Sequence, residues 1–162
     1  MRPKSFVILG VSHRVQGDMD FINAFDDPDY REIVNKIISD DHIDFVGEEG
    51  SVNTTDAERI AQNLLGAGHY ISVDPVLEED KKTHGIGQTY LPPALGELPV
   101  HRWVVSENEK REQIWVDLLV ERTAARGLLI CGFYHAFSVA AKLFCGGFSV
   151  DARTYMPWEK LG

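Results

Sequence analysis

Short apolar runs alternate with longer amphipathic segments along the whole 162-residue chain, and this alternation constrains the fold more than any other feature. The runs are nearly continuous, as is typical of strands buried on both faces of a sheet. Strands are expected at residues 4–10, 42–50, 69–75, 128–132 and 148–155. Such an order predicts a single α/β domain, with a mostly parallel sheet of about five strands and helices on both faces.

The segments between these runs contain residues that are typical of helix starts, so we expect helices there. Asp27 can cap a helix over residues 27–40, and Pro28 suits its first turn. The pairs Thr55–Glu58 and Ser106–Glu109 have capping-box spacing, which predicts helices over residues 55–68 and 106–127. A fourth helix is expected over residues 135–147, where the pattern stops at a Gly-Gly pair.

Residues 76–105 show no clear period and contain three prolines. A loop of this length in a compact domain is usually functional, so we expect an irregular lid over the site. The alternative is that this segment packs on a second copy of the chain and forms a homodimer. His84 and His101 lie inside it and are interpreted as surface residues.

Charge and composition exclude several classes of protein. The net charge of −9, without any dense Lys/Arg segment, argues against a nucleic-acid partner. No run of 18 apolar residues is present, so no membrane span is expected. The two cysteines, Cys131 and Cys145, lie in apolar surroundings, which favours free thiols and a cytoplasmic location.

The pattern Gly-x-x-His occurs three times, at residues 10–13, 66–69 and 132–135. The first and last copies follow a buried strand, where glycine permits a tight turn with positive φ. His13 and His135 should therefore lie at the carboxyl edge of the sheet, where α/β proteins bind ligands. His69 opens a strand at the opposite edge and is interpreted as structural. For His13 and His135, the alternative is that the shared pattern is a coincidence.

Glu48 and Glu49 end the second expected strand, at the same edge as the two histidines. Neighbouring residues on a strand face opposite ways, so at most one of them should point at the histidines. Imidazole and carboxylate together suit Zn²⁺, Mn²⁺ or Co²⁺, or a metal-free pair that activates water. The alternative is that Glu48 and Glu49 simply belong to a solvated turn. Arg111 could stabilise an oxyanion or a substrate carboxylate, or simply pair with Glu107.

A strand followed by "GVSH", a strand ending in "EE", the helix "REQIWVDLL" and a strand followed by "GFYH" occur in this order. This arrangement resembles the TraB/Tiki and erythromycin-esterase-like/ChaN superfamily. The resemblance implies an α/β scaffold whose members include metal-dependent proteases, water-activating esterases and a haem-binding protein. It points to His13, Glu48 or Glu49, Arg111 and His135 as the functional residues.

Together these patterns favour a metal-assisted hydrolase of ester or amide bonds that acts on a small-molecule or peptide substrate. His13, Glu48, Glu49 and His135 are the candidate metal ligands or bases, and Arg111 the candidate for stabilising negative charge. The alternative is a non-enzymatic protein that binds a small ligand, or acts as an inhibitor, through the same crevice. A nucleotide-binding protein is disfavoured because no P-loop and no Gly-x-Gly-x-x-Gly pattern follows a strand.

Overall fold

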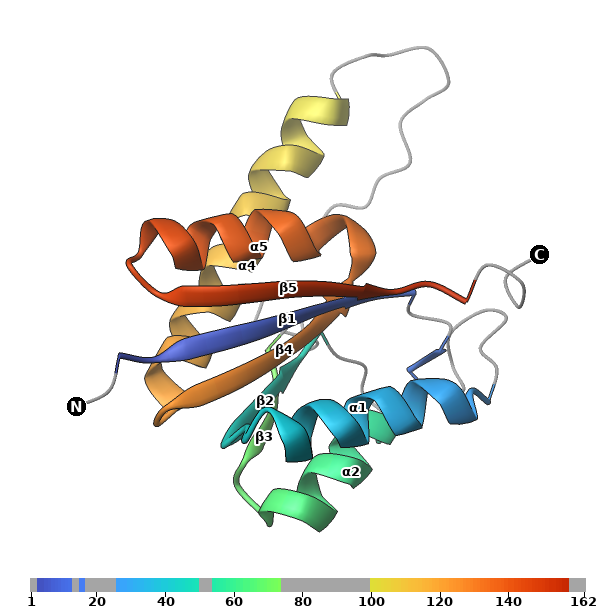
Figure 1. The fold of residues 1–162 in the computed structure, drawn as a ribbon. Coiled ribbons are helices and arrows are strands. Elements are labelled where there is room, and N and C mark those ends of the chain that lie inside the picture. The colour runs from blue at the N-terminus through green and yellow to red at the C-terminus, as the bar shows by residue number, and fades with distance from the viewer. Residues whose placement is uncertain (1–2, 13–14, 17–25, 50–53, 74–99, 158–162) are drawn as a thin grey trace.

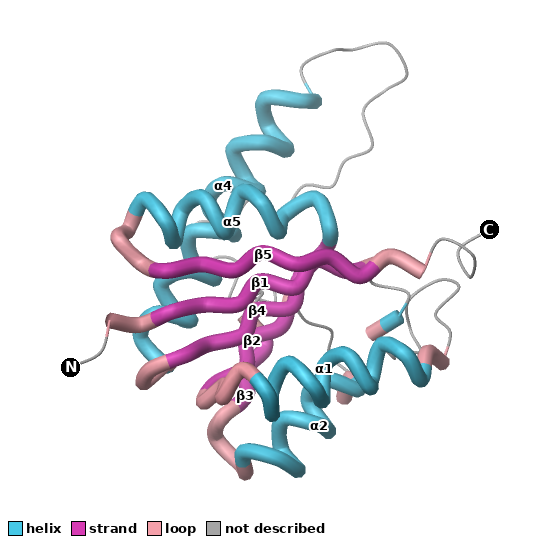
Figure 2. The backbone as a smooth tube through the Cα atoms, viewed as in Figure 1, coloured by secondary structure: helices cyan, strands magenta, loops and turns pink. Residues whose placement is uncertain are grey.

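The computed structural model describes residues 3–12, 15–16, 26–49, 54–73 and 100–157, with only the backbone described for residues 100–107. Five parallel strands form one sheet in the order β3-β2-β4-β1-β5. Figure 2 shows these strands side by side in the centre of the molecule. The strands are β1 (Ser5–Val11), β2 (Phe45–Glu48), β3 (Tyr70–Ser72), β4 (Arg126–Gly132) and β5 (Ser149–Tyr155).

Two pairs of helices cover the two faces of the sheet, as Figure 1 shows. One face carries α1 (Pro28–Asp40) and α2 (Asp56–Leu65), and the other carries α4 (Val100–Arg122) and α5 (Phe133–Cys145). The predicted α/β domain with a parallel five-stranded sheet is thus confirmed. Within the described residues, no helix is long and apolar enough to cross a membrane.

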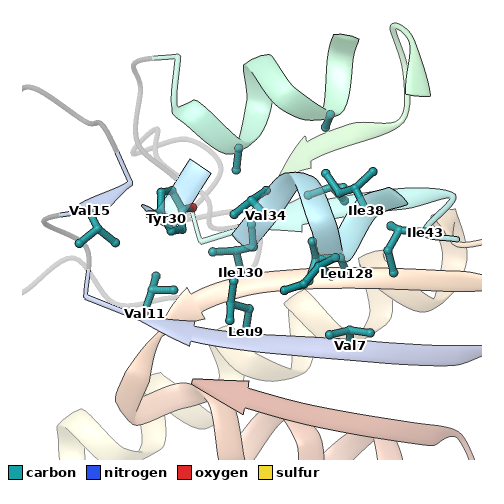
Figure 3. Packing of buried hydrophobic residues seen from close by; sticks show 14 residues of the cluster. Val7, Leu9, Val11, Val15, Tyr30, Val34, Ile38, Ile43, Leu128 and Ile130 are labelled. Carbon is teal, nitrogen blue, oxygen red and sulfur yellow. The ribbon is translucent and has the colours of Figure 1, made fainter. Parts of the chain in front are cut away.

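The side chains of β1 alternate between two separate hydrophobic clusters, as strand geometry requires. Val7, Leu9 and Val11 pack with α1 and α2 (Figure 3), whereas Phe6 and Ile8 pack with α4 and α5. Each face of the sheet therefore buries its own core, which explains why the central strands read as continuous apolar runs.

The predicted caps of the first two helices are present. The Asp27 side chain accepts hydrogen bonds from the backbone N–H groups of Asp29 and Tyr30 at the start of α1. Thr55 Oγ1 accepts one from the Glu58 N–H at the start of α2. Each cap satisfies N–H groups that have no partner within the helix.

The start of α4 was predicted wrongly. The helix begins at Val100, so Ser106 lies inside it and residues 100–105 are helical instead of irregular. The sequence contains the reason, because Val100, Trp103 and Val104 extend the helical spacing of apolar residues before the capping-box pattern. The rest of the expected lid, residues 76–99, lies outside the described residues.

The glycines before the two candidate histidines do not have the positive φ that we expected. Gly10 lies within β1, where an added Cβ would come within 2.8 Å of Ala136 Cβ on α5. Gly132 ends β4 and caps α5 with a φ of −55°. Close approach of a helix explains Gly10, whereas a left-handed turn does not.

Candidate functional site

The topology brings the end of β2 beside the end of β4, and this contact builds the candidate site. Glu48 pairs with Ile130 in the parallel register, so Glu49 comes level with the last residues of β4. The Glu49 N–H donates to Ile130 O at 2.8 Å, and Glu49 Oε2 accepts from the Gly132 N–H at 2.7 Å. Because α5 starts directly after Gly132, the first turn of this helix lies over the Glu49 carboxylate.

Glu49 meets two of the residues that the sequence predicted. Arg111 Nη2 donates to Glu49 Oε1 at 3.1 Å, and His135 Nε2 lies 3.9 Å from the same oxygen. The Glu49 side chain is only 8% exposed, so this ion pair is largely shielded from solvent. Three segments far apart in sequence, the end of β2, α4 and α5, therefore meet at one carboxylate. The Glu107 side chain, the alternative partner of Arg111, lies outside the described residues.

A second carboxylate, Glu112, holds the other side of the imidazole, and the sequence analysis missed it. His135 Nδ1 lies 2.8 Å from Glu112 Oε1, and Ser138 Oγ donates to Glu112 Oε2 at 2.5 Å. Burial raises the pKa of Glu112, but the hydrogen bonds from His135 and Ser138 outweigh it and lower the pKa overall. An ionised carboxylate can only accept, so Nδ1 of His135 is the donor.

Trp115, one turn after Glu112 on α4, forms the floor of the site. Its ring is fully buried and meets the His135 ring edge-on, with centroids 5.1 Å apart. The Arg111 guanidinium carbon lies 5.2 Å from the centre of the same ring, which is cation–π geometry. The indole thus restrains both the histidine and the arginine. The indole N–H finds no hydrogen-bond partner among the described residues.

Glu48 faces the other side of the sheet, toward α1 and α2. Its Oε1 accepts from Gln16 Nε2 at 2.7 Å, and its Oε2 accepts from Tyr70 OH at 2.7 Å and from Thr55 Oγ1. Burial raises the pKa of Glu48 from its ordinary value of 4.5 to about 7, although these three hydrogen bonds oppose the rise. The opposite orientation of the two glutamates follows the strand alternation that the sequence analysis used.

Of the other histidines that the sequence analysis considered, only His69 has a described side chain. His69 precedes β3 at the amino edge, where its Nδ1 lies 2.8 Å from Asp44 O, in keeping with the structural interpretation. His13, and the side chains of His84 and His101, lie outside the described residues. Of the predicted set, the structure brings together Glu49, Arg111 and His135, and it places Glu48 on the opposite face.

The donor set around Glu49 fits a divalent metal poorly. Both Glu49 oxygens are engaged, one by Arg111 and one by the Gly132 N–H, and Nδ1 of His135 is engaged by Glu112. Over the parts of the chain that the structure describes, no group of three His, Cys, Asp or Glu residues is arranged to hold a metal ion. Bound metal would need a further ligand such as His13.

Cys131, the neighbour of Gly132, is the nearest thiol to the site. The side chain is completely buried, and its pKa is raised well above the ordinary value by burial first and by the charges of Glu49 and Glu112 second. A thiol in this state does not ionise readily and is a poor nucleophile. The chemistry available is therefore that of an oriented imidazole beside a carboxylate and a guanidinium.

Comparison with protein-family models, with curated proteins and with solved structures gives no match to this chain.

Proposed function

We propose that the chain is a hydrolase of ester or amide bonds in which His135 activates a water molecule. The observation that carries this proposal is the orientation of the imidazole by Glu112. In the neutral imidazole, donation from Nδ1 to the Glu112 carboxylate at 2.8 Å leaves the lone pair on Nε2. A base held by a buried carboxylate in this way is the arrangement by which hydrolases orient a catalytic histidine.

The water would lie between His135 and Glu49. The distance of 3.9 Å between His135 Nε2 and Glu49 Oε1 is too long for a direct hydrogen bond. One water molecule can bond to both atoms, because a common point lies about 2.8 Å from each. Glu49 would then orient the water, while Nε2 accepts its proton as the oxygen attacks the carbonyl carbon.

The remaining steps need a cation and a proton donor. The charge that develops on the carbonyl oxygen would be stabilised by Arg111, whose side chain is 20% exposed and can reach a ligand as well as Glu49. The imidazolium formed at His135 is stabilised by Glu112 and returns its proton from Nε2 to the leaving alkoxide or amine. Each proton taken from water is thus delivered to the leaving group.

The proposal also covers the compartment of the protein and a metal-assisted version of the reaction. Two free cysteines, one of them exposed, suit the reducing cytoplasm that the sequence suggested. A metal-assisted reaction with Zn²⁺, Mn²⁺ or Co²⁺ remains the version favoured by the family resemblance. It would draw a ligand such as His13 from outside the described residues.

The experiment is a panel of p-nitrophenyl esters and labelled peptides, assayed with the purified full chain. His135→Gln should lower kcat/KM by at least about a hundredfold, as loss of a general base does. His69→Gln is the matched control, because this histidine lies at the opposite edge of the sheet, and it should leave turnover unchanged. Glu112→Gln should lower kcat more than it raises KM, since Gln holds the imidazole less favourably once it is charged.

Two further arms complete the design. Turnover that survives a chelator supports the metal-free reaction, whereas loss on chelation and recovery with Mn²⁺, Zn²⁺ or Co²⁺ supports the metal-assisted one. Equal turnover of the parent chain and His135→Gln contradicts the proposal. Absence of turnover on the whole panel, with His135-dependent binding of a substrate analogue, supports the non-enzymatic ligand-binding alternative instead.

A further inference from the structure

The outer surface of α5 carries a row of exposed aromatic side chains. Tyr134 is 92% exposed, Phe137 is 60% exposed and Phe144 is 72% exposed, while Ala136, Val139 and Leu143 of the same helix are buried. Single exposed apolar residues are common, but these recur at helical spacing and form one strip. An aromatic strip of this extent is typical of a protein-interaction surface.

Two of the three rings, Phe137 and Phe144, lie on the side of α5 that faces away from α4. His135, Ser138 and Lys142 mark the side toward α4, because all three contact Glu112. At about 100° per residue, Phe137 and Phe144 fall on the opposite flank of the helix. Since α5 packs on β1 and β5, with β5 the outermost strand, this flank lies above the open edge of the sheet (Figure 1).

The edge strand β5 is long and carries a self-complementary pair of charges. It pairs with β1 along all seven of its residues, and no other described strand pairs with its outer side. Asp151 and Arg153 are two residues apart, so both project from the same face of the sheet. Their side chains form an ion pair with each other at 2.6 Å, and Arg153 also pairs with Asp41, after the end of α1, at 2.7 Å.

We propose that a second copy of this chain docks on this edge, through antiparallel pairing of β5 with β5. In the register centred on Ala152, Asp151 of each copy lies opposite Arg153 of the other, which gives two attractive cross-strand pairs. A register centred on residue 151 or 153 sets like charges opposite each other instead. Charge therefore selects one two-fold arrangement, and the charges that normally protect an edge strand do not oppose it.

The same arrangement brings the aromatic strips together. A two-fold axis perpendicular to the sheet keeps both α5 helices on one face, antiparallel to each other. Strands lie about 4.8 Å apart, and α5 lies over the gap between β1 and β5. The two helix axes would then be about 10 Å apart, which is the upper end of normal helix packing and suits aromatic contacts. Strand pairing and helix packing are thus satisfied by one geometry.

The expected affinity is modest. The exposed rings would bury on the order of 300–500 Å² per copy, and the paired strands would add to this area. The total is near 1,000 Å², roughly the lower limit for a specific interface. We therefore expect a dimer with a dissociation constant on the order of micromolar. This inference is independent of the proposed hydrolase activity.

Sedimentation velocity of the full chain across a concentration series tests the proposal. Asp151→Arg and Arg153→Asp should each weaken self-association roughly tenfold or more, because each places like charges in both cross-strand pairs. An equimolar mixture of the two variants should form heterodimers as tight as the parent dimer, because opposite charges then face each other. Recovery in the mixture shows that both variants are folded and that the loss lies in pairing.

Matched controls separate this surface from general effects of charge and polarity. Phe137→Asp should abolish the dimer, whereas Leu64→Asp, at an exposed apolar position on α2, should not change it. Asp117→Arg on α4 repeats the charge change of Asp151→Arg away from β5 and should also leave the dimer intact. A parent chain that stays monomeric at high micromolar concentration overturns the proposal. So does a dimer that survives Phe137→Asp, or a mixture of the charge variants that does not associate.

Discussion

Replacement of Glu48 by Gln should remove a large pH dependence from the stability of the protein. Glu48 is completely buried, and burial raises its pKa from 4.5 to about 7. The folded chain therefore holds a proton at this site that the unfolded chain releases between these pH values. Because the folded state binds more protons there, the free energy of unfolding falls as the pH rises from about 4.5 through 7.

The magnitude follows from the size of the shift. A change of one pKa unit corresponds to about 1.4 kcal/mol, so this group should contribute about 3 kcal/mol of stability below pH 4.5 that is lost above pH 7. That amount is a substantial part of the whole stability of a domain of this size. Gln does not titrate, so the free energy of unfolding of the variant lacks this dependence on pH.

Urea denaturation of the parent chain and Glu48→Gln, followed by circular dichroism at several pH values, measures the effect. The free energy of unfolding of the variant, minus that of the parent chain, should rise by about 3 kcal/mol between pH 4.5 and pH 8. Glu32→Gln changes an exposed carboxylate on α1 and is the matched control. Its free energy of unfolding should differ from that of the parent chain by nearly the same amount at every pH. If the difference in the free energy of unfolding between Glu48→Gln and the parent chain is also constant with pH, the reasoning is refuted.

Three further substitutions test the packing that positions the site, each by the free energy of unfolding in urea. Gly10→Ala should cost about 1–3 kcal/mol, because its Cβ would lie 2.8 Å from Ala136 Cβ, and Ala136→Gly in the same chain should recover part of the loss. Asp44→Ala should cost about 2 kcal/mol, because its carboxylate accepts from three backbone N–H groups at residues 124–126, and Asp44→Asn should cost less. Trp115→Ala should cost about 3–5 kcal/mol, and a loss below 1 kcal/mol would contradict its full burial.

The fold was predictable from the sequence because parallel strands buried on both faces leave a strong pattern. Val7, Ile8 and Leu9 are all fully buried although their side chains point to alternate faces, so the run is apolar throughout. The start of α4 was predicted less well. A capping box signals only a possible helix start, and it has no effect when the preceding residues already continue the helix, as residues 100–105 do.

Part of the site was predictable for a topological reason. The carboxyl ends of parallel strands meet at one edge, so Glu49 and His135 were expected on the same edge. The sequence did not state that β2 lies next to β4, and this pairing is what brings Glu49 within 3.9 Å of His135. Strand alternation also required Glu48 and Glu49 to face apart, but which of them faces α4 and α5 depends on the register of β2.

Glu112 was missed although the sequence contained a usable signal. Glu112, Trp115, Val116 and Leu119 follow helical spacing on one face of α4, and all four are buried. A carboxylate on such an apolar face needs a partner, because a buried charge without one is strongly unfavourable. His135, in the first turn of the neighbouring helix α5, supplies that partner at 2.8 Å. A charged residue at an apolar position of a helix therefore predicts a buried polar partner as strongly as the glycine-histidine pattern predicts a site, because burial makes the partner obligatory.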